Sequence, residues 1–137
     1  MAFDVRTIYL DHNSTTPIDP HVMQAMLPFL SDHFGDPAAT YSLGRATQEA
    51  LEDARGRVAE LLGADRDEIV FTSGGTESNQ LAIVGTLLAN APEGGHVAFS
   101  TVEHRSVSQL APLLQRLGYS VSTIGVNGQG QVSPAAV

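Results

Sequence analysis

Apolar residues recur with helical spacing in the first half of the chain, which predicts two helices there. The longer one covers residues 44–62, where apolar side chains return every three or four positions. Gly63 follows its last turn, and glycine often ends a helix. The shorter helix is predicted to begin at Pro20, because Asp19 can cap it and proline suits the first helical position. Pro28 is expected to kink or shorten this helix.

From residue 69 onward the apolar positions form short runs that are typical of strands. These runs are residues 69–71, 96–100 and 119–126. Helices are predicted between them at residues 76–88 and 106–117, and the second should end at Gly118. Strands that alternate with helices through short connections predict a parallel sheet covered by helices. The expected fold class is therefore α/β.

The end of the chain resembles the start of another helix, because Ser133 is a capping residue and Pro134 suits the first position. A parallel sheet of three strands is also small for an α/β domain. We therefore expect one incomplete domain, the truncated N-terminal part of a larger one. Residues 1–63 would form an N-terminal segment of strand and helices, and residues 64–137 would begin the α/β unit.

Composition narrows the function classes. The net charge of −8 argues against nucleic acid or an anionic membrane as the partner, because both need clustered lysine and arginine. No apolar run approaches the roughly 18 residues of a membrane span, and the N-terminus does not resemble a signal peptide. A cytoplasmic location is expected. The chain has no cysteine, so we expect neither disulfides nor a thiolate metal site.

A candidate anion site lies between a predicted strand and helix, in residues 73–78. The first N–H groups of a helix are unpaired, and its dipole favours negative charge at that end. Gly74 and Gly75 would let a phosphate approach the backbone, and the Thr76 hydroxyl could donate a further hydrogen bond. The same residues also suit an ordinary glycine turn with a helix cap.

His104 follows the next predicted strand, so it is expected at the same edge of the sheet. An imidazole there could stack on an aromatic cofactor and move protons near neutral pH. A histidine after a strand can also be a helix cap or a surface residue. The two candidate features support each other because both belong to one sheet edge.

Four segments in this order resemble the N-terminal part of cysteine desulfurases, which are class V aminotransferase-like enzymes. These segments are residues 9–17, 34–37, 69–82 and 103–104. The resemblance runs from Ile8 to the last residue. It implies a fold-type I transferase sheet and pyridoxal 5'-phosphate as cofactor. It also implies removal of sulfur from L-cysteine, giving alanine and an enzyme persulfide for iron–sulfur cluster or thionucleoside synthesis.

The resemblance also implies roles for single residues. Gly75 and Thr76 match positions that bind the cofactor phosphate. His104 matches the catalytic histidine that stacks on the pyridine ring and transfers protons, and residues 13–16 would approach the mouth of the site. The lysine that attaches the cofactor and the cysteine that accepts sulfur lie further along in the family. This chain has neither, so it is expected to be inactive alone.

The family further implies a homodimer, with a sulfur-acceptor or scaffold protein as a possible partner. The loop around residues 36–41 departs from the family pattern, as do Asn79 and Gln80, which leaves the branch of the family open. One alternative is a short subunit of a split enzyme, or a protein that binds a sulfur-transfer partner. Another is a fragment of a different class V enzyme, such as a selenocysteine lyase or an aminotransferase.

Overall fold

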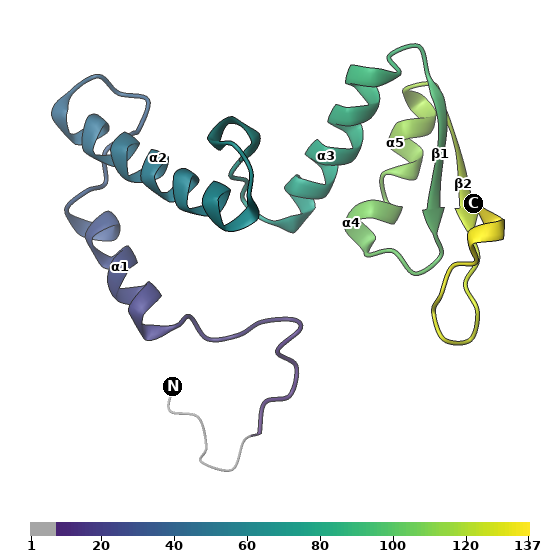
Figure 1. Ribbon diagram of the computed structural model, residues 1–137, viewed down its shortest axis with the longest axis horizontal. Coiled ribbons are helices and arrows are strands. Elements are labelled where there is room, and N and C mark those ends of the chain that lie inside the picture. Colours follow the sequence, from purple (N-terminus) through teal and green to yellow (C-terminus); the bar gives the residue numbers. More distant parts are fainter. Residues whose placement is uncertain (1–7) are drawn as a thin grey trace. The chain divides into compact units, whose positions relative to one another are not determined.

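The computed structural model describes residues 8–137 and divides them into two compact units, one ending at Ile69 and the other beginning at Val70 (Figure 1). The first unit contains helices α1 (Pro20–Ser31) and α2 (Ser42–Leu62) and the 3₁₀ turn η1 (Arg66–Glu68). Both predicted helices are thus confirmed. The boundary predicted between residues 63 and 64 stays a prediction.

The ends of α1 and α2 follow the capping residues that the sequence contains. The Asp19 carboxylate accepts a hydrogen bond from the His21 N–H at 2.8 Å, and Pro20 is the first residue of α1. The helix continues through Pro28 to Ser31, so this proline does not end it. Gly63 ends α2 in the left-handed conformation with φ of 66°, which glycine adopts without steric cost.

The second unit is a small α/β structure. Its elements are α3 (Gly75–Asn90), β1 (Gly95–Ser100), α4 (Arg105–Ser108), α5 (Ala111–Arg116), β2 (Tyr119–Ile124) and the 3₁₀ turn η2 (Pro134–Ala136). Strands β1 and β2 pair in parallel, with Gly95 opposite Tyr119 and Ser100 opposite Ile124. Figure 1 shows α3, α4 and α5 on one side of the two strands. The predicted α/β class with a parallel sheet and covering helices is confirmed.

The predicted strand at residues 69–71 is wrong. Ile69 has extended backbone angles, φ −98° and ψ 121°, but residues 69–71 pair with no strand among the described residues. The sheet in this part of the chain therefore has two strands instead of three. An extended segment becomes a strand only when a neighbour accepts and donates its backbone hydrogen bonds.

The single helix predicted at residues 106–117 is divided into α4 and α5. Pro112 explains the division, because it has no N–H to donate to the carbonyl of Ser108 and its ring would clash with that carbonyl. The predicted end at Gly118 is confirmed, with φ of 94°. Strand β2 ends at Ile124, two residues before the predicted end, and the predicted final helix is only the 3₁₀ turn η2.

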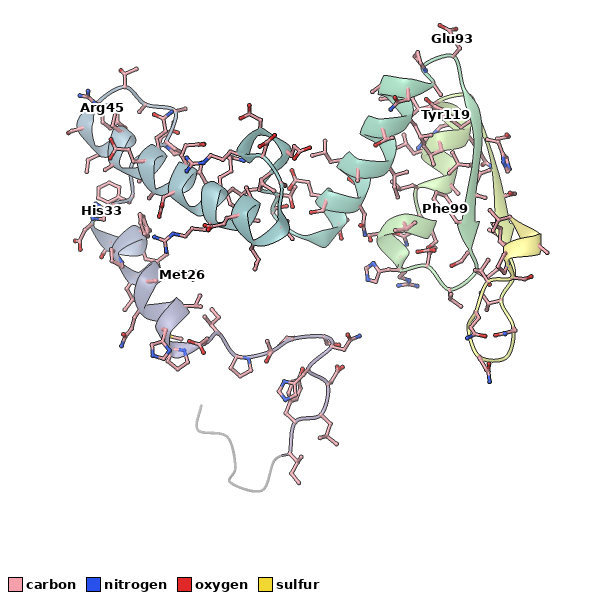
Figure 2. The ribbon with its side chains drawn as sticks, in the orientation of Figure 1. Met26, His33, Arg45, Glu93, Phe99 and Tyr119 are labelled. Carbon is pink, nitrogen blue, oxygen red and sulfur yellow. The ribbon has the colours of Figure 1, made fainter. Side chains whose placement is uncertain are left out.

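The core of the second unit lies between the helices and the sheet. Phe99 of β1 and Tyr119 of β2, both labelled in Figure 2, pack with Leu110 and Leu114. Leu114 is completely buried. The Tyr119 hydroxyl donates a hydrogen bond to the Ala91 carbonyl at 2.7 Å, which joins the end of α3 to the sheet. These contacts hold α3 and α5 on the same face of the strands.

Replacing Leu114 with alanine should lower the free energy of unfolding by about 2–5 kcal/mol, because it removes buried methyl groups and leaves a cavity. Leu113→Ala is the matched control, since Leu113 is the preceding residue of α5 and is 38% exposed. Leu113→Ala should lower the free energy of unfolding by clearly less than Leu114→Ala. Urea unfolding followed by circular dichroism compares the two variants. Equal losses would contradict the assignment of Leu114 to the core.

Candidate functional site

The N-terminus of α3 has backbone N–H groups available for a ligand. Ser78 is the first residue whose N–H bonds within the helix, to the Gly74 carbonyl at 3.1 Å. The N–H groups of Gly75, Thr76 and Glu77 have no hydrogen-bond partner among residues 8–137. These groups and the helix dipole favour an anion at this end. The local geometry therefore has the donors that a phosphate needs.

The space beside these donors is open. A Cβ atom added to Gly74 or Gly75 would meet no atom within 4 Å, and Thr76 is exposed. A phosphate could therefore come close to the backbone without displacing a side chain. Residues 74–76 fit a phosphate group on this observation. Their role as cofactor ligands stays a prediction.

The turn that precedes α3 is held in place by Glu77. Its carboxylate accepts hydrogen bonds from the Ser73 hydroxyl at 2.6 Å and from the Ser73 N–H at 2.7 Å. The hydroxyl bond and then the backbone bond lower the pKa of Glu77 below its usual range, and they outweigh desolvation, which acts in the opposite direction. A second brace joins the Thr72 and Ser78 hydroxyl oxygens, which are 2.6 Å apart. Both braces shape the loop whose N–H groups face the open space.

His104 is the N-cap of α4 and is connected to α3 by hydrogen bonds. Its Nδ1 accepts the backbone N–H of Ser106 at 3.1 Å, and the Ser106 Oγ lies 2.8 Å from the same nitrogen. The side-chain amide of Asn79, in α3, donates to this Oγ at 2.8 Å. Asn79 is three residues after Thr76 on the same helix. The structure therefore brings the N-terminal part of α3 and the His104 segment together, and the catalytic role of His104 stays a prediction.

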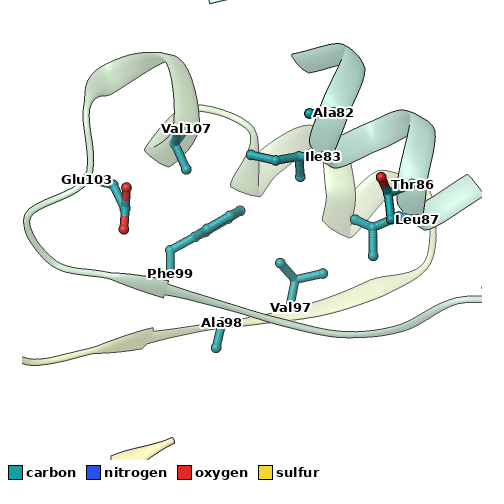
Figure 3. A pocket seen from close by; sticks show the side chains of 9 residues that line it. All are labelled: Ala82, Ile83, Thr86, Leu87, Val97, Ala98, Phe99, Glu103 and Val107. Atoms are coloured by element: carbon teal, nitrogen blue, oxygen red, sulfur yellow. The ribbon is translucent and has the colours of Figure 1, made fainter. Parts of the chain in front are cut away.

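An apolar pocket of about 520 Å³ lies between α3, β1 and α4 (Figure 3). Its lining side chains include Ile83, Leu87, Val97 and Phe99. Gly75, Thr76 and His104 do not line it. The pocket therefore does not include the predicted cofactor-site residues, although Glu103, the residue before His104, lies in its wall.

Comparison with known proteins decides the family. The family described as Aminotransferase class-V matches residues 8–137. The chain belongs to the class-V aminotransferases. This match covers all the residues that the structure describes.

Relatives of this class-V chain are named cysteine desulfurases. This chain is 43% identical over 129 residues to "Cysteine desulfurase IscS" of Dictyoglomus turgidum. The match covers 94% of this chain and 33% of that protein. The solved structure of a "NIFS-LIKE PROTEIN" superposes with a TM-score of 0.85 at 28% identity, covering 94% of this chain and 35% of the other. A second solved structure, described as "SspA in complex with cysteine", superposes with a TM-score of 0.77 at 37% sequence identity. This match covers 85% of this chain and 34% of the other. This chain thus spans about a third of the length of the relatives that it matches.

The structure of this class-V chain adds residues that sequence reasoning did not assign to the site. Ser73 and Glu77 lie within the predicted anion segment, residues 73–78, but neither had a role of its own there, although their spacing of four residues could have indicated the brace. Asn79 and Ser106 had no assigned role. The sequence could not reveal their contact, because 27 positions separate them.

None of the described helices is long and apolar enough to cross a membrane.

We expect an NMR titration to find the pKa of Glu77 below that of an ordinary glutamate. Because folding lowers this pKa, the brace stabilises the turn above the pKa of the unfolded chain, and this stabilisation is lost as the pH falls through the folded value. Ser73→Ala keeps the backbone bond and removes the hydroxyl bond, so it should raise the Glu77 pKa part of the way. An unchanged pKa in Ser73→Ala would show that the hydroxyl bond is absent in solution.

Proposed function

We propose that this chain forms the N-terminal part of the cofactor-binding domain of a pyridoxal-phosphate-dependent cysteine desulfurase. The observation that carries the proposal is the open N-terminus of α3, which Asn79 and Ser106 connect to the imidazole of His104. Relatives named cysteine desulfurase, and a neighbour described as a complex with cysteine, support this reaction and L-cysteine as the substrate.

Each site residue has a definite task in this proposal. The N–H groups of Gly75 and Thr76, with the Thr76 hydroxyl, would bind the cofactor phosphate through charge-assisted hydrogen bonds. His104 would lie against the pyridine ring and exchange protons with the reacting molecule. Pyridoxal phosphate, when bound, supplies the electron sink that weakens bonds in the substrate amino acid. The Ser73–Glu77 brace would keep the phosphate-binding turn ordered before the ligand arrives.

Other sequence must complete the enzyme. The chain contains neither lysine to attach the cofactor nor cysteine to accept sulfur. Strand β1 pairs only with β2 in the described residues, so its second edge has backbone groups free to pair with a further strand. A two-stranded sheet with one covered face is a weak unit by itself. The proposal therefore assigns the lysine, the cysteine and further strands to sequence outside this chain, within a homodimer that passes sulfur to an acceptor protein.

The isolated chain should release no alanine or sulfide from L-cysteine above the background of free pyridoxal phosphate. The reason is that no residue of the chain can hold the cofactor covalently or receive the sulfur. Alanine and sulfide are measured with the purified chain, with free cofactor as the control. Turnover well above that control would show that the chain works by a different mechanism.

A chimera tests the function itself. The chain replaces the aligned segment of the Dictyoglomus turgidum desulfurase, to which it is 43% identical. The chimera should bind pyridoxal phosphate and desulfurate L-cysteine. Thr76→Val should weaken cofactor binding about ten- to hundredfold, as expected for one hydrogen bond to a charged group. His104→Ala should lower kcat by about 10²- to 10⁴-fold.

Thr86→Val is the matched control in the chimera. Thr86 lies on the same helix α3, more than two turns beyond Thr76, and it lines the apolar pocket instead of the phosphate-binding turn, so an apolar replacement there should change neither cofactor binding nor kcat. Cofactor absorbance and alanine release are the two measurements. A folded chimera that binds no cofactor, or one in which Thr76→Val and Thr86→Val behave alike, would refute the assignment of the phosphate site.

A further inference from the structure

Two donors of Ser106 face the same ring nitrogen of His104. The backbone N–H of Ser106 points to Nδ1 with an N···N distance of 3.1 Å, and the Ser106 Oγ is 2.8 Å from Nδ1. A backbone N–H can only donate. Nδ1 must therefore be the acceptor of this bond and carry no hydrogen in the neutral ring.

Asn79 sets the direction of the second bond. Its side-chain Nδ2 donates to the Ser106 Oγ at 2.8 Å, which uses the serine oxygen as an acceptor. The serine hydroxyl then keeps its own hydrogen for Nδ1. Ser106 is only 8% exposed, so water competes little for this hydroxyl. The hydrogen bonds therefore all donate in one direction, from Asn79 to Ser106 and from Ser106 to His104.

We infer that Asn79 and Ser106 are positioning residues that hold neutral His104 as the Nε2–H tautomer. Nδ1 is occupied by the two Ser106 donors, whereas Nε2 has no hydrogen-bond partner within residues 8–137. The ring thus offers its hydrogen to a ligand at Nε2, and any proton exchanged with a bound molecule passes through that atom. The identity of this molecule rests on the proposed function, but the tautomer does not.

The choice of tautomer matters because the two ring nitrogens have different roles. An imidazole whose second nitrogen is held by a fixed partner has one defined tautomer and one defined ring orientation. The Ser106 backbone N–H fixes which ring nitrogen accepts, and the buried Ser106 hydroxyl adds a second bond, which Asn79 of α3 orients. The tautomer and orientation of the His104 ring are therefore fixed before any ligand binds.

Nitrogen NMR on the labelled 137-residue chain, with no cofactor added, tests the inference directly. At alkaline pH, Nδ1 of His104 should resonate as an unprotonated ring nitrogen and Nε2 as a protonated one. A coupling across the hydrogen bond should connect the Ser106 amide nitrogen to Nδ1. A protonated Nδ1, or the absence of this coupling, would overturn the inference without any variant.

Two variants test the parts played by the side chains. Asn79→Asp should remove the second bond, because a carboxylate accepts the Ser106 hydroxyl hydrogen and leaves a serine lone pair facing Nδ1. The Nδ1 shift should then move, while Nδ1 stays unprotonated because the Ser106 backbone N–H still donates to it. Ser106→Ala should also move the Nδ1 shift, whereas Ser106→Thr keeps the hydroxyl and should restore it.

Ser108→Ala is the control, because the Ser108 hydroxyl lies on α4 and reaches only the His104 carbonyl, at 3.5 Å. It should leave the ring shifts unchanged. The amide signals of Leu114 and Tyr119 report whether each variant keeps its core. If Asn79→Asp and Ser106→Ala fold and give wild-type ring shifts, the side chains are not positioning residues. Because no cofactor is used, that result is distinct from a failure of the chimera to bind pyridoxal phosphate.

Discussion

The parallel pairing of β1 and β2 requires the chain to cross from the end of one strand back to the start of the other, and the second unit is organised around this crossing. Helices α4 and α5 make the connection and cover the sheet, where Leu110 and Leu114 pack against Phe99 and Tyr119. The crossing begins just beyond Ser100, so the His104 segment lies at the carboxyl end of β1. This is the end of an open α/β sheet at which ligands bind.

The candidate site combines a braced turn with open donors. The Ser73–Glu77 bonds order the loop before α3, while the neighbouring N–H groups remain available. Ordering a loop costs conformational entropy, and a loop that is already ordered does not impose this cost on ligand binding. The same logic applies to His104, whose ring is held by Ser106 instead of being free to rotate. The chain thus prepares two parts of one site through bonds within itself.

Membership of the class-V aminotransferases places this arrangement in a larger framework. The chain spans about a third of its relatives, and its sheet has two strands in the described residues. The apolar pocket beside α3 and the second edge of β1 are surfaces of the kind that continued α/β structure would cover. The chain's own contribution in our proposal is the phosphate-binding turn and the oriented imidazole, and the covalent chemistry belongs to residues outside it.

Local sequence determined the elements whose signals lie within a few residues. Helical spacing predicted α2, capping residues predicted its end at Gly63 and the start of α1 at Pro20, and Gly118 marked the turn before β2. The division between α4 and α5 was also readable at Pro112, although the periodicity concealed it. Tertiary structure alone decided that residues 69–71 form no strand here, because pairing depends on a distant neighbour. It also decided the contact between Asn79 and Ser106, since only the packing of α3 beside α4 brings together side chains that are 27 positions apart.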